Sequence, residues 1–261
     1  MTTAPPDPFL TMAGTTLMQL TVVESARVSP NLQRLVLTAP ELAGFESLPG
    51  QDIMLLVDTD TDTGSGTDGG RPVRRRYSIA ALDTGNRRLT LDIVRHAGGG
   101  PGEQWVQAVR PGMTVQGIGP RGKVSPDTGA DWHLFIGDES ALAAIFSMAR
   151  SLPADKSATV ILEVPEPADE QELEPKAKVH TEWLPRLGRP AGDAGALAQA
   201  ARTVEIPPGR IHAYLIGEAR VVLALREVLE ARGVDPGVIS PKAYWGRGKS
   251  NAGHGEPARD R

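Results

Sequence analysis

Short apolar runs separated by turn residues fill the first half of the chain. In RRLTLDIVRH, residues 87–96, Leu89, Leu91 and Ile93 alternate with Thr, Asp and Val, and a DTGN turn signal precedes the run. A period of two is typical of a strand with one buried face. Since similar runs recur from residue 20 to about residue 126, the pattern predicts an antiparallel β-barrel.

After Asp131 the pattern changes, and apolar runs alternate with helical segments. WHLFIGD leads into ESALAAIFSMARSL, and IHAYLIGE leads into ARVVLALREVLEARG. In the last of these, Val221, Leu225 and Leu229 fall on one helical face, and Gly233 is placed to end the helix. Alternating strands and helices predict a second domain, an α/β fold built on a parallel sheet.

We therefore expect two domains with a flexible segment at each end. The predicted order is a flexible N-terminus, a β-barrel domain, an α/β domain and a flexible tail, at residues 1–14, 15–129, 130–248 and 249–261. A chain of 261 residues is long enough to give each of two modest domains its own core.

Composition and charge narrow the classes of function. The formal net charge of −4 argues against a general nucleic-acid binder, because such proteins use broad basic surfaces. The chain has no cysteine, which excludes disulfides, thiolate catalysis, and zinc or iron–sulfur clusters held by its own cysteines. Redox chemistry would therefore need a bound organic cofactor or an external metal.

The sequence predicts a cytoplasmic protein without membrane insertion. The N-terminal sequence MTTAPPDPFLTMAG lacks the basic and apolar regions of a secretory signal. No window approaches the roughly 18 uninterrupted apolar residues that a membrane-spanning helix needs. We also expect the protein to be a monomer.

Three consecutive arginines precede Tyr77 and Ser78 in the segment RRRYSIA. On a strand, Arg75 and Tyr77 would share one face while Arg76 and Ser78 share the other. A nearby anion, such as a nucleotide pyrophosphate, would relieve the repulsion among the arginines. A charged, solubilising edge strand explains the same residues equally well.

Two further segments combine glycines with the start of a helix. HAGGGPGEQWVQAV, residues 96–109, could present backbone amides to a phosphate, although glycine-rich turns of this kind are common. FIGDESALAAI, residues 135–145, lies where open α/β sheets bind ligands but lacks the GxGxxG fingerprint. LIGEAR repeats the Gly-acid arrangement, so the two strand ends form either one edge of a cleft or a pair of helix starts.

Near the end of the sequence, Tyr244 and Trp245 stand beside Arg247 and Lys249. This group could cover a flat anionic ligand, or the two aromatic rings could simply close the core. Elsewhere, the five histidines show no metal-ligand spacing, so we expect no metal site. Ser140 lacks the GxSxG turn of a nucleophilic hydrolase.

In their order along the chain, these motifs resemble those of the siderophore-interacting protein family, flavin-dependent ferric-siderophore reductases related to the ferredoxin-NADP reductase superfamily. The order RxYS, DIVRH, a GPG loop with Trp105, GPRG, GDES, GE and YWGRG carries the resemblance. The resemblance implies an N-terminal six-stranded antiparallel barrel that binds FAD. It also implies a C-terminal parallel-sheet domain similar to an NAD(P)H-binding module.

The resemblance implies site residues as well. Arg75 would meet the FAD pyrophosphate, Tyr77 would pack on the isoalloxazine, and Ser78 would lie near its reactive edge. The other positions that match the family's cofactor motifs are Asp92, Ile93, Val94, His96, Gly100, Pro101, Gly102, Trp105, Gly137, Asp138, Glu139, Ser140, Ala141, Tyr244 and Trp245. The chain departs from the family where Ile93 replaces Phe, and where YWGRG replaces YWRxG.

The reaction that the resemblance implies passes electrons from NADPH or NADH through FAD to Fe(III) held by a siderophore, with ferredoxin as an alternative donor. The flavin would supply the chemistry, so no catalytic side chain is assigned. A basic rim would steer an anionic ferric siderophore, and the candidate cations are Arg74, Arg76, Lys242, Arg247 and Lys249.

Two alternative functions stay open. One is a flavin reductase or electron-transfer oxidoreductase with another acceptor, and the other is a non-catalytic flavin- or siderophore-binding protein. The choice between NADH and NADPH stays open too, with three candidate cations for a 2′-phosphate: Lys178, Arg186 and Arg189.

Overall fold

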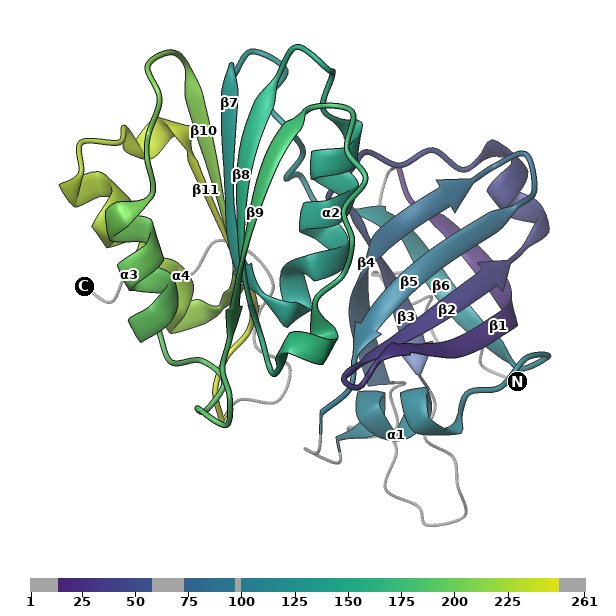
Figure 1. Cartoon of the computed structure of the whole chain (residues 1–261). Helices are drawn as coiled ribbons and strands as arrows, with labels where there is room; N and C mark the ends of the chain where they lie inside the picture. The colour runs from purple at the N-terminus through teal and green to yellow at the C-terminus, as the bar shows by residue number, and fades with distance from the viewer. Residues whose placement is uncertain (1–13, 58–72, 97–99, 249–261) are drawn as a thin grey trace, which may run out of the picture. The chain divides into compact units, whose positions relative to one another are not determined.

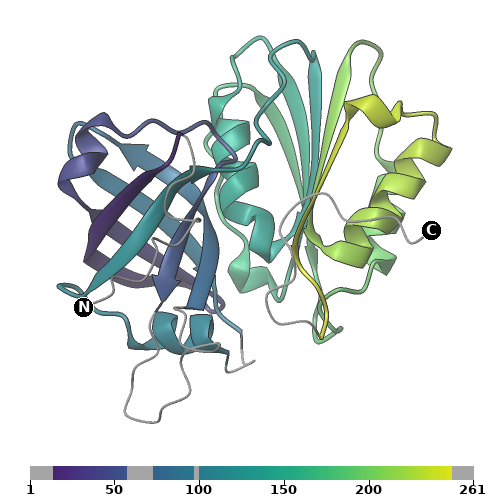
Figure 2. The ribbon, with the colours of Figure 1, turned by 180° about the vertical axis from the view of Figure 1, so that it is seen from behind.

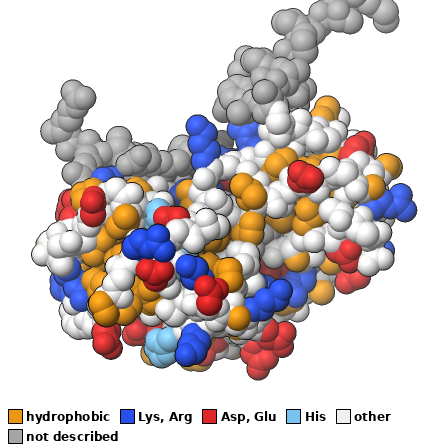
Figure 3. All heavy atoms as spheres, turned by 90° about the horizontal axis from the view of Figure 1, so that it is seen from above, with side chains coloured by type: hydrophobic (Ala, Val, Ile, Leu, Met, Phe, Trp, Pro, Cys, Tyr) orange, Lys and Arg blue, Asp and Glu red, His pale blue; other side chains and the backbone are white. Residues whose placement is uncertain are grey.

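Two compact units make up this computed structural model, and they divide in the chain between Lys123 and Val124, except that residues 29–31 group with the second unit. The structure describes residues 14–57, 73–96 and 100–248. Within these ranges, no helix is long and apolar enough to cross a membrane. On the face seen in Figure 3, acidic and basic side chains are interspersed.

The first unit is a closed antiparallel barrel with the strand order β1-β2-β5-β4-β3-β6 (Figure 1). Its strands are β1 (Thr16–Ser29), β2 (Leu32–Thr38), β3 (Asp52–Val57), β4 (Val73–Asp83), β5 (Arg88–Val94) and β6 (Thr114–Arg121). A 3-10 helix, η2 (Pro40–Gly44), and an α-helix, α1 (Pro101–Ala108), complete the described elements of this unit. The barrel predicted from the alternating pattern is thus confirmed.

Alternation along the strands fills the barrel with aliphatic side chains. On β5, the predicted inward residues Leu89, Leu91 and Ile93 are all buried in the core. The register sets Leu35 opposite Leu91, so apolar side chains of neighbouring strands meet inside the barrel. On β6 a glycine is required, because a Cβ at Gly117 would lie 2.5 Å from Leu20 Cδ1.

The second unit is a five-stranded parallel sheet with the order β11-β10-β7-β8-β9. Its strands are β7 (Trp132–Asp138), β8 (Ser157–Val164), β9 (Lys178–Pro185), β10 (Ile211–Glu218) and β11 (Ile239–Trp245). Its α-helices are α2 (Leu142–Ser151), α3 (Gly195–Thr203) and α4 (Ala219–Ala231), and its 3-10 helices are η3 (Glu139–Ala141), η4 (Pro167–Asp169) and η5 (Pro236–Val238).

Helices cover both faces of this sheet, with α3 and α4 on one face and α2 on the other (Figures 1 and 2). Every residue of the central strand β7 is therefore buried, as parallel sheets require. The order of the strands reverses between β7 and β10, which makes the carboxyl ends of these two strands the expected position for a ligand.

The helix predicted to follow β7 begins later than expected. The sequence placed its start near Glu139 or Ser140, but α2 begins at Leu142 after the 3-10 turn η3. The carboxylate of Asp138 accepts a hydrogen bond from the Ser140 backbone N–H, which caps this turn. The helix predicted after β10 ends at Ala231, and Gly233 adopts a φ of 85° just beyond it.

Candidate functional site

In the barrel unit, β4 directs Arg75 and Tyr77 to one side of the strand, as its alternation predicts. Tyr77 packs against the barrel core, and its ring stacks on the ring of Trp105 from α1 at 6.4 Å and 24°. Burial raises the pKa of Tyr77 well above its usual value, so the phenol stays neutral at any physiological pH. The pair forms an uncharged aromatic surface.

The side chain of Arg75 lies against the first turn of α1. A Cβ at Gly102 would lie 3.0 Å from Arg75 Nε, so any larger residue would have to displace this side chain. Pro101 opens the helix, and no side chain caps it at Gly100. A guanidinium beside the positive end of a helix is a favourable site for an anion such as a pyrophosphate.

Glu103, which sequence reasoning did not single out, orders the loop before α1. Its buried carboxylate accepts hydrogen bonds from the His96 backbone N–H at 3.1 Å and from Gln107 Nε2 at 2.8 Å. Arg95 lies 3.8 Å from the same carboxylate. Because Glu103 is engaged by these groups, its negative charge is balanced within the barrel unit.

The DIVRH segment supplies structural contacts at two of its predicted site residues. Asp92 accepts two hydrogen bonds from Arg34, at 2.7 and 2.8 Å, across the β2–β5 pair. Ile93 is buried in the barrel core. Among the residues of this motif His96 is exposed, and Val94 is half-buried.

The opposite side of β4 carries a cluster of cations around one carboxylate. Arg76 donates to Asp52 through Nε and Nη2, at 2.8 and 2.5 Å. Arg121, at the end of β6, stands opposite Asp52 in the register, yet its buried Nε and Nη1 have no hydrogen-bond partner among the described residues. Burial lowers the pKa of Arg121, and the charges of Arg76 and Arg74 add to the shift.

Buried guanidinium donors without acceptors indicate a place for an anionic group. The sequence analysis placed Arg74 and Arg76 in a basic rim but missed Arg121. The GPRG motif contains this arginine. Nothing in the motif, however, shows that its donors would remain unsatisfied.

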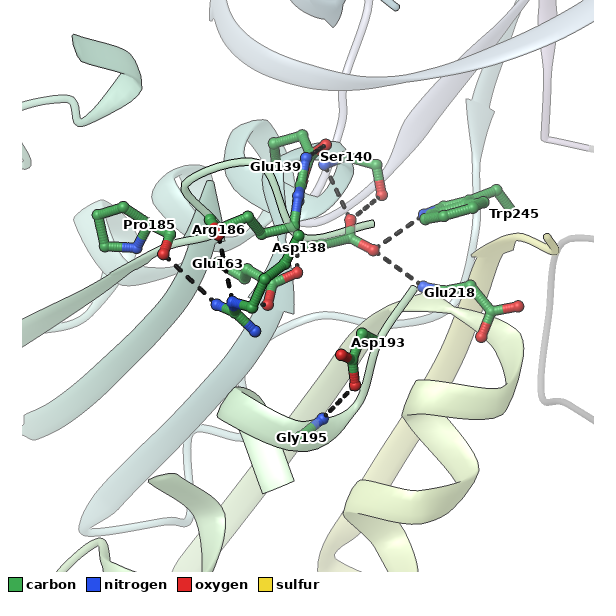
Figure 4. Close-up of polar contacts among 11 residues, drawn as sticks. Asp138, Glu139, Ser140, Glu163, Pro185, Arg186, Asp193, Gly195, Glu218 and Trp245 are labelled. Atoms are coloured by element: carbon green, nitrogen blue, oxygen red, sulfur yellow. Dashed lines mark hydrogen bonds and ion pairs between the residues drawn. The ribbon is translucent and has the colours of Figure 1, made fainter. Parts of the chain in front are cut away.

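In the second unit, Asp138 joins the carboxyl ends of three strands (Figure 4). Its Oδ1 accepts hydrogen bonds from the backbone N–H and the hydroxyl of Ser140. Its Oδ2 accepts from the Glu218 backbone N–H at 3.0 Å and from Trp245 Nε1 at 2.9 Å. Burial raises the pKa of Asp138 to about 6, and the charge of Glu139 adds to the shift.

Two glycines make this close approach of strand ends possible. A Cβ at Gly137 would lie 2.5 Å from the Ile216 carbonyl oxygen, and one at Gly217 would lie 2.6 Å from Asp138 Oδ2. Gly217 also adopts a φ of 151°, a conformation that favours glycine. The Gly-acid pairs noted in the sequence therefore lie side by side at one edge of the sheet.

Glu218 caps the helix α4 and fixes the chain after β11. Its Oε2 accepts from the Arg220 and Val221 backbone N–H groups at 2.6 and 3.0 Å, and its Oε1 accepts from the Arg247 backbone N–H at 3.0 Å. The interpretation of the Gly-acid motif as a helix start is thus confirmed at Glu218, whereas its interpretation as one edge of a cleft stays a prediction.

A second charged group lies at the ends of β8 and β9 (Figure 4). Arg186 donates to both oxygens of Glu139 at 2.6 Å and lies 3.3 Å from Glu163. Although burial opposes ionisation, these carboxylates raise the pKa of Arg186 above its usual value.

The predicted residues at the end of the chain separate into distinct roles. The indole N–H of Trp245 donates a hydrogen bond to Asp138. Lys242 Nζ lies over the ring of Tyr244, 5.0 Å from its centroid. Arg247 uses its backbone N–H, and its side chain is exposed. Lys249 lies outside the described residues. Within residues 14–57, 73–96 and 100–248, no three His, Asp or Glu side chains gather as a metal site.

Comparisons with known proteins cover both units. Residues 21–124 match the family model described as the siderophore-interacting FAD-binding domain, and residues 130–248 match the one described as siderophore-interacting protein. The ferric vibriobactin reductase ViuB of Vibrio cholerae is 30% identical over 91% of this chain and 92% of its own length. The NADPH-dependent ferric-chelate reductase of Escherichia coli is 27% identical over 87% of this chain and 92% of its own.

A solved structure shows the same similarity in three dimensions. The siderophore utilization protein from T. fusca matches with a TM-score of 0.82 at 29% identity, over 94% of this chain and 98% of its own. The similarity therefore covers the barrel and the parallel sheet together.

Proposed function

Because this chain belongs to the siderophore-interacting protein family, we propose that it is an FAD-dependent reductase that passes electrons from NADH or NADPH to siderophore-bound Fe(III). One nicotinamide cofactor gives up two electrons as a hydride, and each Fe(III) takes one. The balanced reaction therefore converts NAD(P)H and two ferric siderophores into NAD(P)⁺, a proton and two ferrous siderophores. Fe(II) binds weakly to the hard oxygen ligands of a siderophore and leaves it.

The observation that carries the proposal is the Arg75–Gly102 contact at the start of α1. It holds a guanidinium beside the helix terminus, where the two together can bind the pyrophosphate of FAD. In the same unit, the half-buried Tyr77 ring, which stacks on the buried Trp105, would offer a flat apolar surface. FAD, when bound, would accept two electrons together and release them singly.

The remaining predicted cofactor residues fall into backbone and side-chain roles. Gly100, Pro101 and Gly102 would present backbone groups at the start of α1. Ser78, which is buried on the other side of β4, would place its hydroxyl near the flavin edge. In the second unit, Gly137 to Ala141 would shape the nicotinamide site at the end of β7.

Each unit presents its own cations to an anionic substrate. Arg121 brings unsatisfied donors in the barrel unit, whereas Arg76 is already paired with Asp52. In the second unit, Arg247 is the exposed candidate, whereas Lys242, predicted for the same rim, is only 5% exposed and its Nζ is buried. These side chains would raise the local concentration of an anionic ferric siderophore, and they do not need to bind the iron.

The test is an anaerobic titration of the FAD-loaded protein. We expect NADH or NADPH to bleach the flavin absorption, and a ferric catecholate to restore it with release of two Fe(II) per nicotinamide oxidised. Bleaching without reoxidation by any ferric chelate would favour a reductase with another acceptor. Flavin binding without bleaching would favour a carrier, once reduced ferredoxin has also failed as a donor.

A further inference from the structure

The charges at the carboxyl ends of β7, β8 and β9 bear on which nicotinamide cofactor the protein uses. This inference rests on the proposed function, which puts a dinucleotide at the point where the strand order reverses. In open α/β sheets the ligand lies at the carboxyl ends of the strands, where an acid favours the 2′-hydroxyl of a dinucleotide and an arginine accommodates a 2′-phosphate. Here Glu163 lies at the end of β8, opposite Asp138 in the register.

A 2′-phosphate needs a cation, and Arg186 is the buried cation nearest to Glu163. Its guanidinium donates to both oxygens of Glu139 at 2.6 Å and to Glu163 at 3.3 Å. Its side chain is only 7% exposed. To reach a phosphate, Arg186 would have to leave two carboxylates, one of them fully buried, without their counter-charge, which is strongly unfavourable.

Arg189 is the next cation along the chain, and although its side chain is 39% exposed, it also contacts groups of its own chain. Its Nε donates to the Arg186 carbonyl oxygen at 3.2 Å, its Nη2 donates to the Pro185 carbonyl oxygen at 3.4 Å, and Nη2 lies 3.8 Å from Glu163. The two arginines together only neutralise Glu139 and Glu163. The carboxyl ends of β7, β8 and β9 also carry Asp138 and the exposed Glu166, so their net charge is negative.

The third candidate from the sequence, Lys178, lies at the wrong end of the sheet. It begins β9, whereas Pro185 ends it. Seven residue steps along a strand span roughly 23 Å at 3.3 Å per residue. Lys178 therefore belongs to the amino edge and cannot meet a phosphate at the carboxyl edge.

We propose that the electron donor is NADH, and that Glu139 and Glu163 determine this preference by holding Arg186 away from a 2′-phosphate. The phosphate of NADPH would bring a charge of about −1.5 to −2 to an edge that is already negative. The 2′-hydroxyl of NADH is neutral and can donate to a carboxylate. The preference should be at least tenfold in the second-order rate constant for flavin bleaching.

The experiment compares both cofactors on the FAD-loaded protein by anaerobic stopped-flow absorption, at concentrations below saturation. Glu139→Gln removes one carboxylate charge from Arg186 at a partly exposed side chain, and we expect it to move the NADH/NADPH ratio several-fold toward NADPH. Glu174→Gln is the matched control, because it makes the same change of net charge at an exposed residue before β9. It should leave the ratio unchanged.

A binding measurement supplies a readout that does not depend on turnover. Isothermal titration with AMP and with adenosine 2′,5′-bisphosphate should show the weaker binding for the bisphosphate, with the difference reduced in Glu139→Gln. Equal or faster bleaching by NADPH, or an unchanged ratio in Glu139→Gln, would overturn the inference. So would a failure of both cofactors to bleach a flavin that dithionite does reduce.

The proposed function can fail separately. If NADH bleaches the flavin in preference to NADPH but no ferric chelate restores the absorption, the acceptor is wrong and the donor preference stands.

Discussion

Single residues decide whether the barrel unit can hold a dinucleotide flavin. Gly102 is one of them, because a Cβ there would meet three atoms of Arg75 at 3.0 to 3.2 Å. We predict that Gly102→Ala displaces Arg75 and weakens FAD binding roughly tenfold, about 1.4 kcal/mol. The measurement is a fluorescence titration of apoprotein with FAD.

The control for that variant is Gly44→Ala, since a Cβ at Gly44 meets nothing within 4 Å. It lies in η2, away from the proposed cofactor residues. Equal FAD affinities for the two variants would remove the steric argument for the Arg75–Gly102 contact.

His133 is a residue whose ionisation should appear in stability. It is 1% exposed, and neither ring nitrogen has a hydrogen-bond partner among the described residues. Burial lowers the pKa of His133 to about 4, and His212 adds to the shift. The unfolded chain protonates this imidazole near pH 6.5, so its contribution to stability is complete above that pH and is lost as the pH falls toward 4.

Lowering the pH from 7 to 4.5 should reduce the free energy of unfolding of both proteins. We predict that the reduction is smaller for His133→Phe than for the wild type, by up to about 3 kcal/mol. Phe preserves the ring that packs near Phe135 and Tyr214. Urea denaturation at each pH measures the difference. His180→Gln, at an exposed residue, should follow the wild type.

The comparison with a variant is necessary because Asp138 acts in the opposite direction. Its raised pKa of about 6 means that the folded protein holds this proton more tightly than the unfolded chain. Its contribution is present at low pH and is lost as the pH rises through about 6. The wild-type curve alone therefore mixes two opposing slopes, and parallel curves for wild type and His133→Phe would exclude a buried neutral His133.

At the scale of elements, the start of α4 depends on one acid. Glu218 is 2% exposed and caps two backbone N–H groups of the helix. We predict that Glu218→Ala destabilises the protein by about 1 to 3 kcal/mol, because it removes the cap and leaves buried donors unsatisfied. Glu227→Ala, on the exposed side of the same helix, should change stability by less than about 0.5 kcal/mol. Thermal unfolding that shows equal losses would mean that the cap is not stabilising.

Most of the order of strands and helices can be predicted from the sequence, for a physical reason. Strands and helices impose periods of two and 3.6 on burial, so residues such as Leu89 and Val221 report their element locally. The first residue of α2 is harder to predict, because the 3-10 turn η3, which the Asp138 side chain caps, comes before it.

The site residues differ, because their partners lie far apart in the chain. Arg186 is paired with Glu139, 47 residues away, and Trp245 with Asp138, 107 residues away. No local pattern shows that the charge of Arg186 is already used. For the same reason, the sequence does not distinguish Arg121 from the other cations, because its position opposite Asp52 arises only from the pairing of β6 with β3.

At the scale of the whole molecule, the sequence motifs and the fold agree on a flavin barrel followed by a parallel-sheet unit. The comparisons give the same order, with the FAD-binding domain model at residues 21–124 and the siderophore-interacting model at 130–248. The account therefore depends most on whether the barrel unit binds FAD.

The most direct test is the uptake of FAD by purified apoprotein, followed by absorption and flavin fluorescence. We predict saturable binding of one FAD per chain, with quenched fluorescence caused by contact with the half-buried Tyr77 ring. A protein that is folded but leaves the absorption and fluorescence of added FAD unchanged would contradict the account.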